Sequence, residues 1–320
     1  MKNKIIAVLK LLLPYLAIAV SILIYFYIPG NGKQKPTDYP YYVYFLLVLG
    51  AGFLVFSLVG IFNSKVRKNA LEKAPFFTGV IVFLLFLNFV TTKTLLLPTL
   101  YFPSLDRIIG LIVENKWFLA KNVLDSFRLL ITGFLWGVSI GFLTGLALGY
   151  SKHVGYWLTP VTKVIGPIPT TAWIPLALSV FPTTHGANVF LIAFAVWFPV
   201  TLMTSSGIQS IANVNFEVSK TLGASTLYQI VHVAIPAAMP SIFLGIFYGT
   251  VSSFATLMAV EMNGNSSGIG WYINWQKSVM MYDGVYAGLI IIAAICSLTL
   301  TILFKVRDKV LVWQKGVIKW

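Results

Sequence analysis

The side chains that could carry acid–base, nucleophilic or metal chemistry are few and scattered in this 320-residue chain. His153, His185 and His232 have neither a carboxylate nor a second histidine at the spacing of a metal site, which needs three or four ligands. Cys296 is the only cysteine, so no disulfide can form within the chain. A membrane-embedded enzyme needs a clustered nucleophile or metal set, and the sequence contains neither. We therefore predict no catalytic or metal site and no cofactor bound by this chain.

A second set of polar side chains lies within the apolar segments. Ser252, Ser253 and Thr256 share one helical face with Gly249, and this face is a candidate for lining the path of a solute. The alternative is that these hydroxyls bond to carbonyls of their own helix. Glu261 follows at the outer end of the same segment and belongs to the candidate path set. A structural hydrogen bond is favoured for it, because a carboxylate repels an anionic solute.

The stretch 217–236, EVSKTLGASTLYQIVHVAIP, is the polar segment with the clearest organisation. Gly223 interrupts a helical pattern near its middle, which predicts two short helices that meet at a turn, and Pro236 marks the start of the next apolar segment. Two interpretations are open: helices that lie on the bilayer surface, or a docking site for a soluble partner. The predicted apolar side holds Val218, Leu222, Tyr228 and Val231, and the polar side holds Glu217, Lys220, Ser225, Gln229 and His232.

The composition predicts an all-α polytopic membrane protein, because 58% of the residues are hydrophobic and only 10% are charged. The net charge of +14 could indicate nucleic-acid binding, but the basic residues lie in short loops between apolar segments. They are therefore interpreted as topology signals, and no nucleic-acid partner is expected. Placing both termini in the cytoplasm puts most of the 23 basic residues, and the 217–236 stretch, on the inner side.

About eight segments are long enough to span a bilayer. The first is interpreted as a retained span rather than a signal peptide, because its apolar run is too long. Between the third and fourth, residues 104–116 are predicted to form an amphipathic helix capped by Ser104. The fifth contains Pro167, Pro169 and Pro175, which must kink the helix beside protein or a water-filled path. The predicted spans are 5–28, 41–62, 76–97, 125–149, 164–181, 188–206, 239–260 and 285–304, with a basic loop at 63–73.

Glycines recur every fourth residue along the fourth span. Four residues slightly exceed one helical turn, so these glycines form a narrow ridge that winds slowly around the helix. Such a ridge permits close approach of another helix, and we assign it a packing role. The residues are Gly133, Gly137, Gly141, Gly145 and Gly149.

The spacing of Glu217, Gly223, Val233, Ile235 and Pro236 resembles the EAA signature, E-A-A-x3-G-x9-I-x-L-P, of the membrane subunits of ATP-binding-cassette (ABC) importers. The residues after Glu217 are valine and serine, which depart from the two alanines of the signature. In that family this loop forms coupling helices that sit in a groove of the ATPase subunit. The resemblance implies an ATPase-coupling set of Glu217, Lys220, Thr221, Gly223, Ala224, Ser225 and Pro236.

Three further segments resemble the nitrate/sulfonate/taurine branch of these permeases. They begin at Asp125 (DSFRLLITGFLWGVSIGFLTGLALG), Pro167 (PIPTTAWIPL) and Met258 (MAVEMNGNSSGIGWYI). The resemblance implies a type I importer permease core with two extra N-terminal helices, in a bacterial inner membrane. The expected domains are a two-span extension (1–75), a further span with the external amphipathic segment (76–124), the core (125–305, with coupling helices at 213–236) and a basic cytoplasmic tail (306–320).

The same resemblance implies the partners of the chain. A cytoplasmic ABC ATPase dimer, a second permease copy that forms a homodimer, an extracytoplasmic solute-binding protein and membrane lipid are expected. The chain contains no Gly-x4-Gly-Lys-Ser/Thr loop, so ATP and Mg²⁺ are expected to bind to the partner ATPase. The implied substrate is a small anion such as nitrate, a sulfonate, taurine or bicarbonate, and the alternative is a vitamin precursor or another small organic molecule. A secondary transporter is disfavoured, because the spans carry no carboxylate apart from Glu261.

Overall fold

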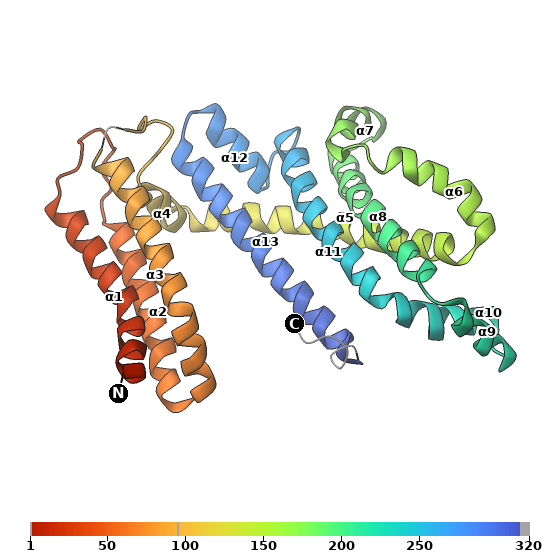
Figure 1. The fold of residues 1–320 in the computed structure, drawn as a ribbon. Helices are drawn as coiled ribbons and strands as arrows, with labels where there is room; N and C mark the ends of the chain where they lie inside the picture. The colour runs from red at the N-terminus through yellow and green to blue at the C-terminus, as the bar shows by residue number, and fades with distance from the viewer. Residues whose placement is uncertain (1, 95, 314–320) are drawn as a thin grey trace. The chain divides into compact units, whose positions relative to one another are not determined.

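The structure of the chain is a computed structural model that describes residues 2–94 and 96–313. The regular structure throughout this part is helical (Figure 1). Seven of the described helices are long and apolar enough to cross a membrane, which confirms the predicted all-α polytopic class. Contacts divide the chain into two compact units: Met1–Trp117 with Trp275–Ala287, and Phe118–Asn274 with Gly288–Trp320.

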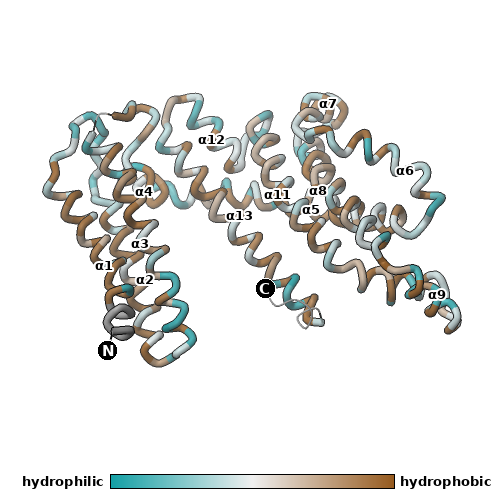
Figure 2. Tube along the Cα trace, viewed as in Figure 1, coloured by the Kyte–Doolittle hydropathy of each residue, from teal (hydrophilic) through white to brown (hydrophobic). Residues whose placement is uncertain are grey.

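The N-terminal unit is built on three long helices, which are hydrophobic over most of their length (Figure 2). Many of their large apolar side chains are exposed, as expected for helices that contact lipid. The helices are α1 (Lys2–Tyr27), α2 (Tyr41–Phe62) and α3 (Ser64–Thr92). Their shared core consists of Ala17, Ile18, Tyr42, Leu46 and Ile81.

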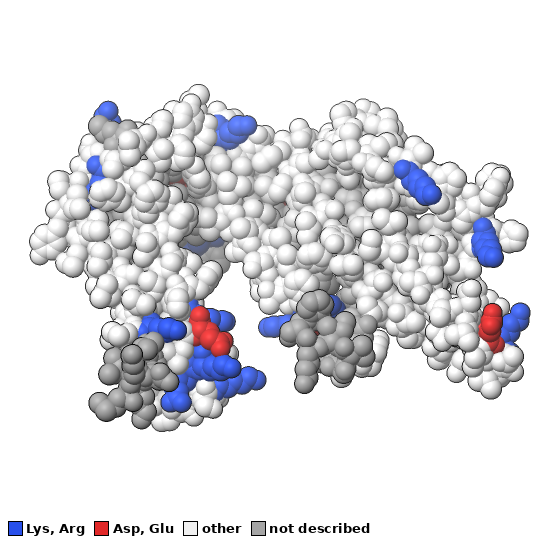
Figure 3. All heavy atoms as spheres, in the orientation of Figure 1, with Lys and Arg blue, Asp and Glu red and all other residues white. Residues whose placement is uncertain are grey.

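The loop predicted at 63–73 is instead the beginning of α3. The Asn63 side chain caps this helix by accepting hydrogen bonds from the backbone N–H groups of Lys65 (3.0 Å) and Val66 (3.4 Å). Since the cap satisfies these N–H groups, the basic segment continues the helix rather than forming a loop. On the face shown in Figure 3, lysine, arginine and acidic side chains of this unit gather at the α2–α3 end of the bundle.

Two ionisable side chains, Asp106 and Lys93, make hydrogen bonds between elements of the N-terminal unit. The Asp106 carboxylate accepts hydrogen bonds from the Tyr42 backbone N–H (3.0 Å) and the Tyr25 hydroxyl (3.3 Å), so it links α1 and α2. Burial raises the pKa of the Asp106 carboxyl above its usual range, against the lowering effect of these hydrogen bonds. The Lys93 ammonium donates to the carbonyls of Tyr25 (3.0 Å) and Ile28 at the C-terminal end of α1, where a cation is favoured.

The short helix α4 (Leu105–Glu114) is the predicted amphipathic helix. The Ser104 hydroxyl accepts a hydrogen bond from the Arg107 N–H (3.4 Å) at its N-terminus, as the sequence predicts. The Arg107 guanidinium also pairs with the carboxylate of Asp283, with 3.1 Å between Nε and Oδ2. This ion pair ties α4 to the segment Trp275–Ala287 within the N-terminal unit.

The second unit is organised around α8 (Thr184–Gln209), against which both α5 (Lys116–Tyr150) and α11 (Ile235–Met262) pack. The glycine ridge of α5 lies directly on α8. A Cβ atom added at Gly137 would lie 2.5 Å from the Ala193 carbonyl oxygen, far inside contact distance. The other glycines of the ridge meet α8 in the same way. The backbones of the two helices therefore approach closely, which is the packing that the spacing predicts.

The predicted fifth span is not one continuous helix. α6 (Lys152–Ile165) ends before Pro167, a 3₁₀ turn covers Thr170–Trp173, and α7 (Ile174–Val180) follows. Proline supplies no N–H and clashes with the carbonyl four residues earlier, which explains the break. This segment is the reason that seven helices rather than eight have the length and composition of a span.

The last two helices are α12 (Ile269–Ser278) and α13 (Tyr282–Val310). The predicted basic tail at 306–320 therefore begins inside α13. Its residues 314–320 lie outside the described residues.

Candidate functional site

The predicted coupling segment consists of two short helices followed by an irregular turn. α9 (Asn213–Thr221) and α10 (Thr226–Gln229) meet at Gly223, whose φ of 83° lies in the left-handed region that favours glycine. The Ser225 hydroxyl caps α10 by accepting from the Tyr228 N–H (3.3 Å). Residues Ile230–Ala234 form a single π-helical turn that leads into α11. This is the arrangement that the interruption at Gly223 predicts.

Most residues of the predicted coupling set face outward. Ala224 is half-buried, and the others are exposed: Glu217, Lys220, Thr221, Gly223, Ser225 and Pro236. Glu217 lies in the middle of α9 rather than in its first turn. The alternative role of a carboxylate that stabilises a helix N-terminus is therefore not supported by its position.

The predicted division of this segment into an apolar and a polar side does not hold, because the apolar residues are exposed together with most of the polar ones. Leu222 and Leu227 are 83% and 71% exposed, whereas the Gln229 side chain is buried. The Gln229 amide makes hydrogen bonds to other parts of the chain, which removes the cost of burying it. The two exposed leucines flank the Gly223 turn, and sequence periodicity alone placed Leu222 on the inner side. The remaining apolar residues of the set, Val218, Tyr228 and Val231, are also exposed.

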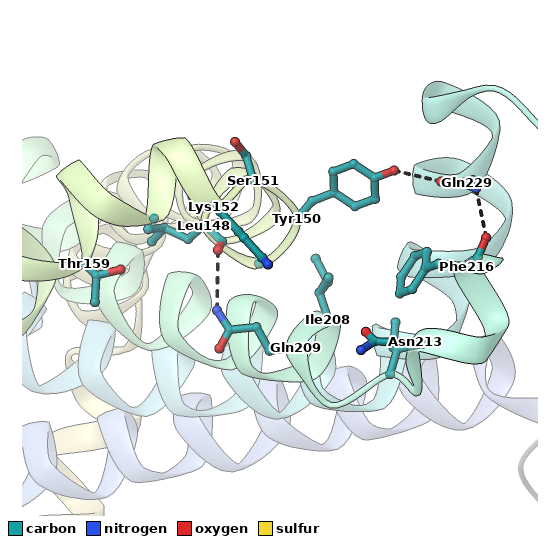
Figure 4. Close-up of a pocket in the computed structure, with 13 residues that line it drawn as sticks. Leu148, Tyr150, Ser151, Lys152, Thr159, Ile208, Gln209, Asn213, Phe216 and Gln229 are labelled. Carbon is teal, nitrogen blue, oxygen red and sulfur yellow. Dashed lines mark hydrogen bonds between the residues drawn. The ribbon is translucent and has the colours of Figure 1, made fainter. Parts of the chain in front are cut away.

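A cavity of about 660 Å³ lies behind the coupling segment (Figure 4). It is lined by the end of α5, the start of α6, the end of α8 and parts of α9 and α10. Tyr150 and Gln229 lie on its wall and are hydrogen-bonded to each other, as the dashed line in Figure 4 marks. Lys152 is the one charged residue in this lining.

A second cavity, of about 440 Å³, brings together most of the predicted path residues. Pro167 and Pro169 of the broken span line it together with Ser252 and Thr256 of α11. Phe194, Phe198 and Pro199 of α8 form an apolar part of the wall, and no ionisable side chain lines this cavity. The sequence did not point to the two phenylalanines, because an apolar ring in a span carries no signal of its own.

The hydroxyls on α11 divide into two kinds. Ser253 is buried and donates to the Thr250 carbonyl of its own helix (2.7 Å), which is the alternative role considered for this set. Ser252 is half-buried and Thr256 is buried, and neither hydroxyl has a hydrogen bond to another described residue. They therefore keep their hydrogen-bonding capacity for an occupant of the cavity.

Glu261 lies away from the path cavity and anchors a turn. Its Oε2 accepts a hydrogen bond from the Gly270 N–H (2.7 Å), while Asn122 and Ser126 of α5 accept from the N–H groups of Gly268 (2.9 Å) and Ile269 (2.8 Å). Three successive N–H groups at the start of α12 are thus satisfied by side chains. Gly268 has a φ of 112°, which an L-residue rarely adopts. This geometry favours a structural role for Glu261.

Among the described residues no group of three histidine, cysteine or acidic side chains could hold a metal ion. The two cavities offer hydrogen bonding and apolar contact, the first of them also the charged Lys152, and the coupling segment offers exposed side chains.

A multi-pass helical chain with an uncharged cavity beside its broken span is consistent with a membrane transport protein. Residues 137–312, a little over half of the chain, match the family model described as binding-protein-dependent transport system inner membrane component. The chain belongs to this family, the permease subunits of ABC importers, and relatives named as permeases for aliphatic sulfonates, taurine and nitrate are similar to it. Membership implies an ATPase partner and a binding protein in general.

Individual relatives agree with this assignment. A Methanocaldococcus jannaschii protein named as an ABC transporter permease is 29% identical over 67% of this chain and 82% of its own length. The Bacillus subtilis protein SsuC, named as an aliphatic sulfonates transport permease, is 32% identical over 58% of this chain and 67% of its own length. The nitrate import permease NrtB of Synechococcus elongatus is 30% identical over 52% of this chain and 59% of its own length.

A solved structure supports the fold. A chain of the MetNI methionine ABC transporter, in an inward-facing conformation, matches 62% of this chain and 98% of its own length with a TM-score of 0.52. The sequence identity is 15%, so this likeness bears on the fold alone. It supports the predicted type I importer core.

Proposed function

We propose that this chain couples to a separate ABC ATPase through residues 213–236 and forms part of the path of a small solute. The observation that carries the proposal is the exposed Gly223 turn, where Leu222 and Leu227 have no apolar neighbour that covers them. Exposed apolar side chains on a structured turn are typical of a protein interface. Most residues of the coupling set are exposed as well.

The assembly that we propose has two permeases and two ATPases. A homodimer is the simplest arrangement in which two permease copies line one path, because most oligomers are built from identical subunits. ATP and Mg²⁺ bind to the ATPase, and an extracytoplasmic solute-binding protein delivers the solute. Both termini lie in the cytoplasm of a cell whose inner membrane holds the chain, and lipid covers the exposed apolar helices.

For the substrate we propose a small anion, such as nitrate or a sulfonate. Relatives named for nitrate and for aliphatic sulfonates support this class. Ser252 and Thr256 supply the free hydroxyls with which the path cavity would bind an oxyanion. Neutral donors suit a transport path, because strong binding would slow release.

A second candidate substrate is a small uncharged organic molecule, such as a vitamin precursor. The uncharged cavity with the rings of Phe194 and Phe198 in its wall favours this candidate. Uptake of a labelled sulfonate, measured in competition with nitrate and with uncharged aromatic solutes, separates the two classes. Competition by anions alone supports the first candidate, and competition by aromatic solutes alone supports the second.

The docking proposal is tested by purifying the tagged chain, expressed with its native gene neighbours, and by measuring the mass of the intact complex. We expect two permeases with two P-loop ATPases. Gly223→Val should abolish this complex, because valine at a left-handed φ costs about 1–2 kcal/mol and distorts the turn. Gly32→Val is the matched control, since Gly32 also has a positive φ (69°) and open space around it but lies in the N-terminal unit.

A lone chain or a simple oligomer without any ATPase would contradict the proposal. Equal loss of the complex in the Gly223→Val and Gly32→Val variants would assign the effect to general misfolding and would also contradict it.

A further inference from the structure

One buried amide joins the three elements that meet behind the coupling segment. The Gln229 side chain is 7% exposed and lies at the end of α10. Its Oε1 accepts a hydrogen bond from the Tyr150 hydroxyl (3.0 Å) at the end of α5. Its Nε2 donates to the Phe216 carbonyl (3.1 Å) and to the Ser219 hydroxyl oxygen (3.0 Å), both in α9. We call these four residues the Gln229 junction, and Figure 4 labels three of them: Tyr150, Phe216 and Gln229.

The partners fix the orientation of this amide. The Phe216 carbonyl can only accept, so the NH₂ group of Gln229 must face it and the carbonyl oxygen must face Tyr150. The Ser219 hydroxyl also donates to the Phe216 carbonyl (2.8 Å), so its oxygen is available to accept from the amide. Three of the four hydrogen-bonding positions of the amide are filled with consistent donor and acceptor roles. Such a buried and satisfied group holds its neighbours in one arrangement.

Tyr150 attaches the junction to α5 in two ways. Its hydroxyl makes the hydrogen bond to Gln229, and its ring packs edge-on against the Phe216 ring with 6.0 Å between the ring centroids. Tyr150 is also the last residue of α5, directly after the end of the glycine ridge at Gly149. A displacement of α9 and α10 therefore acts on the helix that packs along α8.

The other connection from Gln229 is along the backbone. The π-helical turn Ile230–Ala234 follows at once and runs into α11, which carries the free hydroxyls of Ser252 and Thr256. Pro236 has no N–H to donate to the His232 carbonyl. The Ile235 N–H bonds to the Ile230 carbonyl, five residues earlier, rather than to the carbonyl four residues earlier as in an α-helix. A π turn is a common place for a helix to adjust at a functional site. Gln229 thus lies where the docking helices, α5 and the path-lining helix α11 converge.

We propose that Gln229 is a positioning residue that transmits movement of the coupling helices to α5 through Tyr150, while the π turn transmits it to α11. The proposal rests on the docking function proposed above. Without the junction, an ATPase would still bind the exposed face of α9 and α10, but its closure would move α11 without moving α5. Basal hydrolysis of ATP would then continue, but the loaded binding protein would stimulate it little.

The test uses the reconstituted full complex with its binding protein, ATPase and native lipid. Gln229→Glu keeps the shape of the side chain but places a carboxylate oxygen against the Phe216 carbonyl, so it cannot donate there. Tyr150→Phe keeps the ring contact and removes only the hydroxyl. Gln209→Glu is the matched control, because Gln209 lines the same cavity but donates to Leu148 and Ser205, outside the coupling segment.

The measured quantity is the ratio of ATP hydrolysis stimulated by the loaded binding protein to basal hydrolysis, with the mass of the complex as a separate reading. We expect an intact complex and normal basal hydrolysis in all three variants. The stimulated ratio should fall about tenfold in Gln229→Glu, the effect of a bond worth about 1.4 kcal/mol. It should fall about threefold in Tyr150→Phe, which loses one neutral hydrogen bond, and stay near the wild-type value in Gln209→Glu.

A wild-type ratio in an assembled Gln229→Glu complex would overturn the proposal. So would equal losses in Gln229→Glu and Gln209→Glu, or full stimulation in Tyr150→Phe if Gln229→Glu does not assemble. Absence of any ATPase from the wild-type complex is a different result, because it contradicts the docking function itself.

Discussion

Two regions of the second unit use their surfaces in opposite ways. Along the α5–α8 interface, five glycines let two backbones meet, and the Thr144 and Thr201 hydroxyls bond to each other across it (2.7 Å). At the Gly223 turn, two leucines are exposed and a glycine has open space around it. The first region is complete within one chain. The second has the form of a surface that a partner covers.

A permease with these two surfaces can separate folding from coupling. Helices in lipid gain little from apolar burial against one another, so close packing of small residues holds the transmembrane core. The coupling segment carries exposed apolar side chains instead, and its shape is held from behind by the Gln229 junction. Substitutions in the two regions should therefore fail in different ways.

The largest expected effect is a loss of fold in Gly137→Val. The added side chain would overlap the Ala193 carbonyl and Val196, and overpacking of this kind costs about 1–3 kcal/mol or more where backbone must move. The yield of monodisperse protein and its melting temperature in detergent measure the effect. Gly79→Ala, at a helical glycine with no atom within 4 Å of an added Cβ, is the control and should behave as wild type. Normal stability of Gly137→Val would contradict the packing account.

The next effect is a loss of ATPase affinity without loss of fold in Leu222→Ser and Leu227→Ser. Each exposed leucine should contribute about 1–2 kcal/mol at an interface, so each change should weaken binding about tenfold. Titration of the purified permease with its ATPase measures this affinity, and the melting temperature should not change. If both variants bind normally, the turn is not part of the interface.

A smaller effect is expected at the path cavity. Ser252→Ala removes a hydroxyl that is free for a solute, and the loss of about 1 kcal/mol should reduce uptake at low substrate concentration about fivefold. Ser253→Ala, one residue away, removes only a bond to the Thr250 carbonyl and should leave uptake unchanged. Initial rates in proteoliposomes compare the two. Equal effects would mean that the cavity does not select between these hydroxyls.

The smallest effect concerns the N-terminal unit, in which the Asp106 carboxyl group is hydrogen-bonded to Tyr25 and Tyr42. Burial raises the pKa of the Asp106 carboxyl in the folded state, so the charged carboxylate destabilises the fold at neutral pH. This cost begins to fall when the pH drops below the raised pKa, and it is gone below the usual pKa of an aspartate. The unit should therefore become more stable as the pH is lowered from neutral towards mildly acidic values. Asp106→Asn keeps the acceptor for the Tyr42 N–H and should remove this dependence. Melting temperature against pH, compared with wild type, is the measurement. An identical pH profile in the variant would contradict this assignment.

Local patterns in the sequence predicted the spans, the glycine ridge and the turn at Gly223 well. Each of these depends on neighbours in sequence: apolar length, a four-residue repeat, or one glycine within a helical pattern. The helical start of α3 was missed because its cap comes from Asn63 in a strongly basic stretch that is typical of a loop. The sequence predicted a kinked helix at Pro167. The structure has a full break there, with a 3₁₀ turn at Thr170–Trp173 before the next helix, which the prolines alone did not indicate.

The candidate site was predictable only in part, because its decisive contacts join residues far apart in sequence. Gln229 was placed on the polar side of its helix, and its burial depends on Tyr150, 79 residues earlier. The burial of Glu261 follows from its hydrogen bond to the turn at Gly268–Gly270, which Asn122 and Ser126 of α5 also hold. Ser252 faces the path cavity, whereas the Ser253 hydroxyl bonds to the Thr250 carbonyl. Helical periodicity places both residues near one face and cannot separate these two roles.

The most direct test of the account is cross-linking from the Gly223 turn. The only cysteine, Cys296, is first replaced by serine, and Leu222→Cys is then labelled with a photo-activated cross-linker in membranes that contain the native ATPase. The account predicts a product whose mass and peptides contain the P-loop ATPase, whereas Gly32→Cys in the N-terminal unit gives none. Cross-links from Leu222→Cys to lipid or to the permease alone would mean that the turn lies on the membrane surface, and the coupling assignment would be wrong.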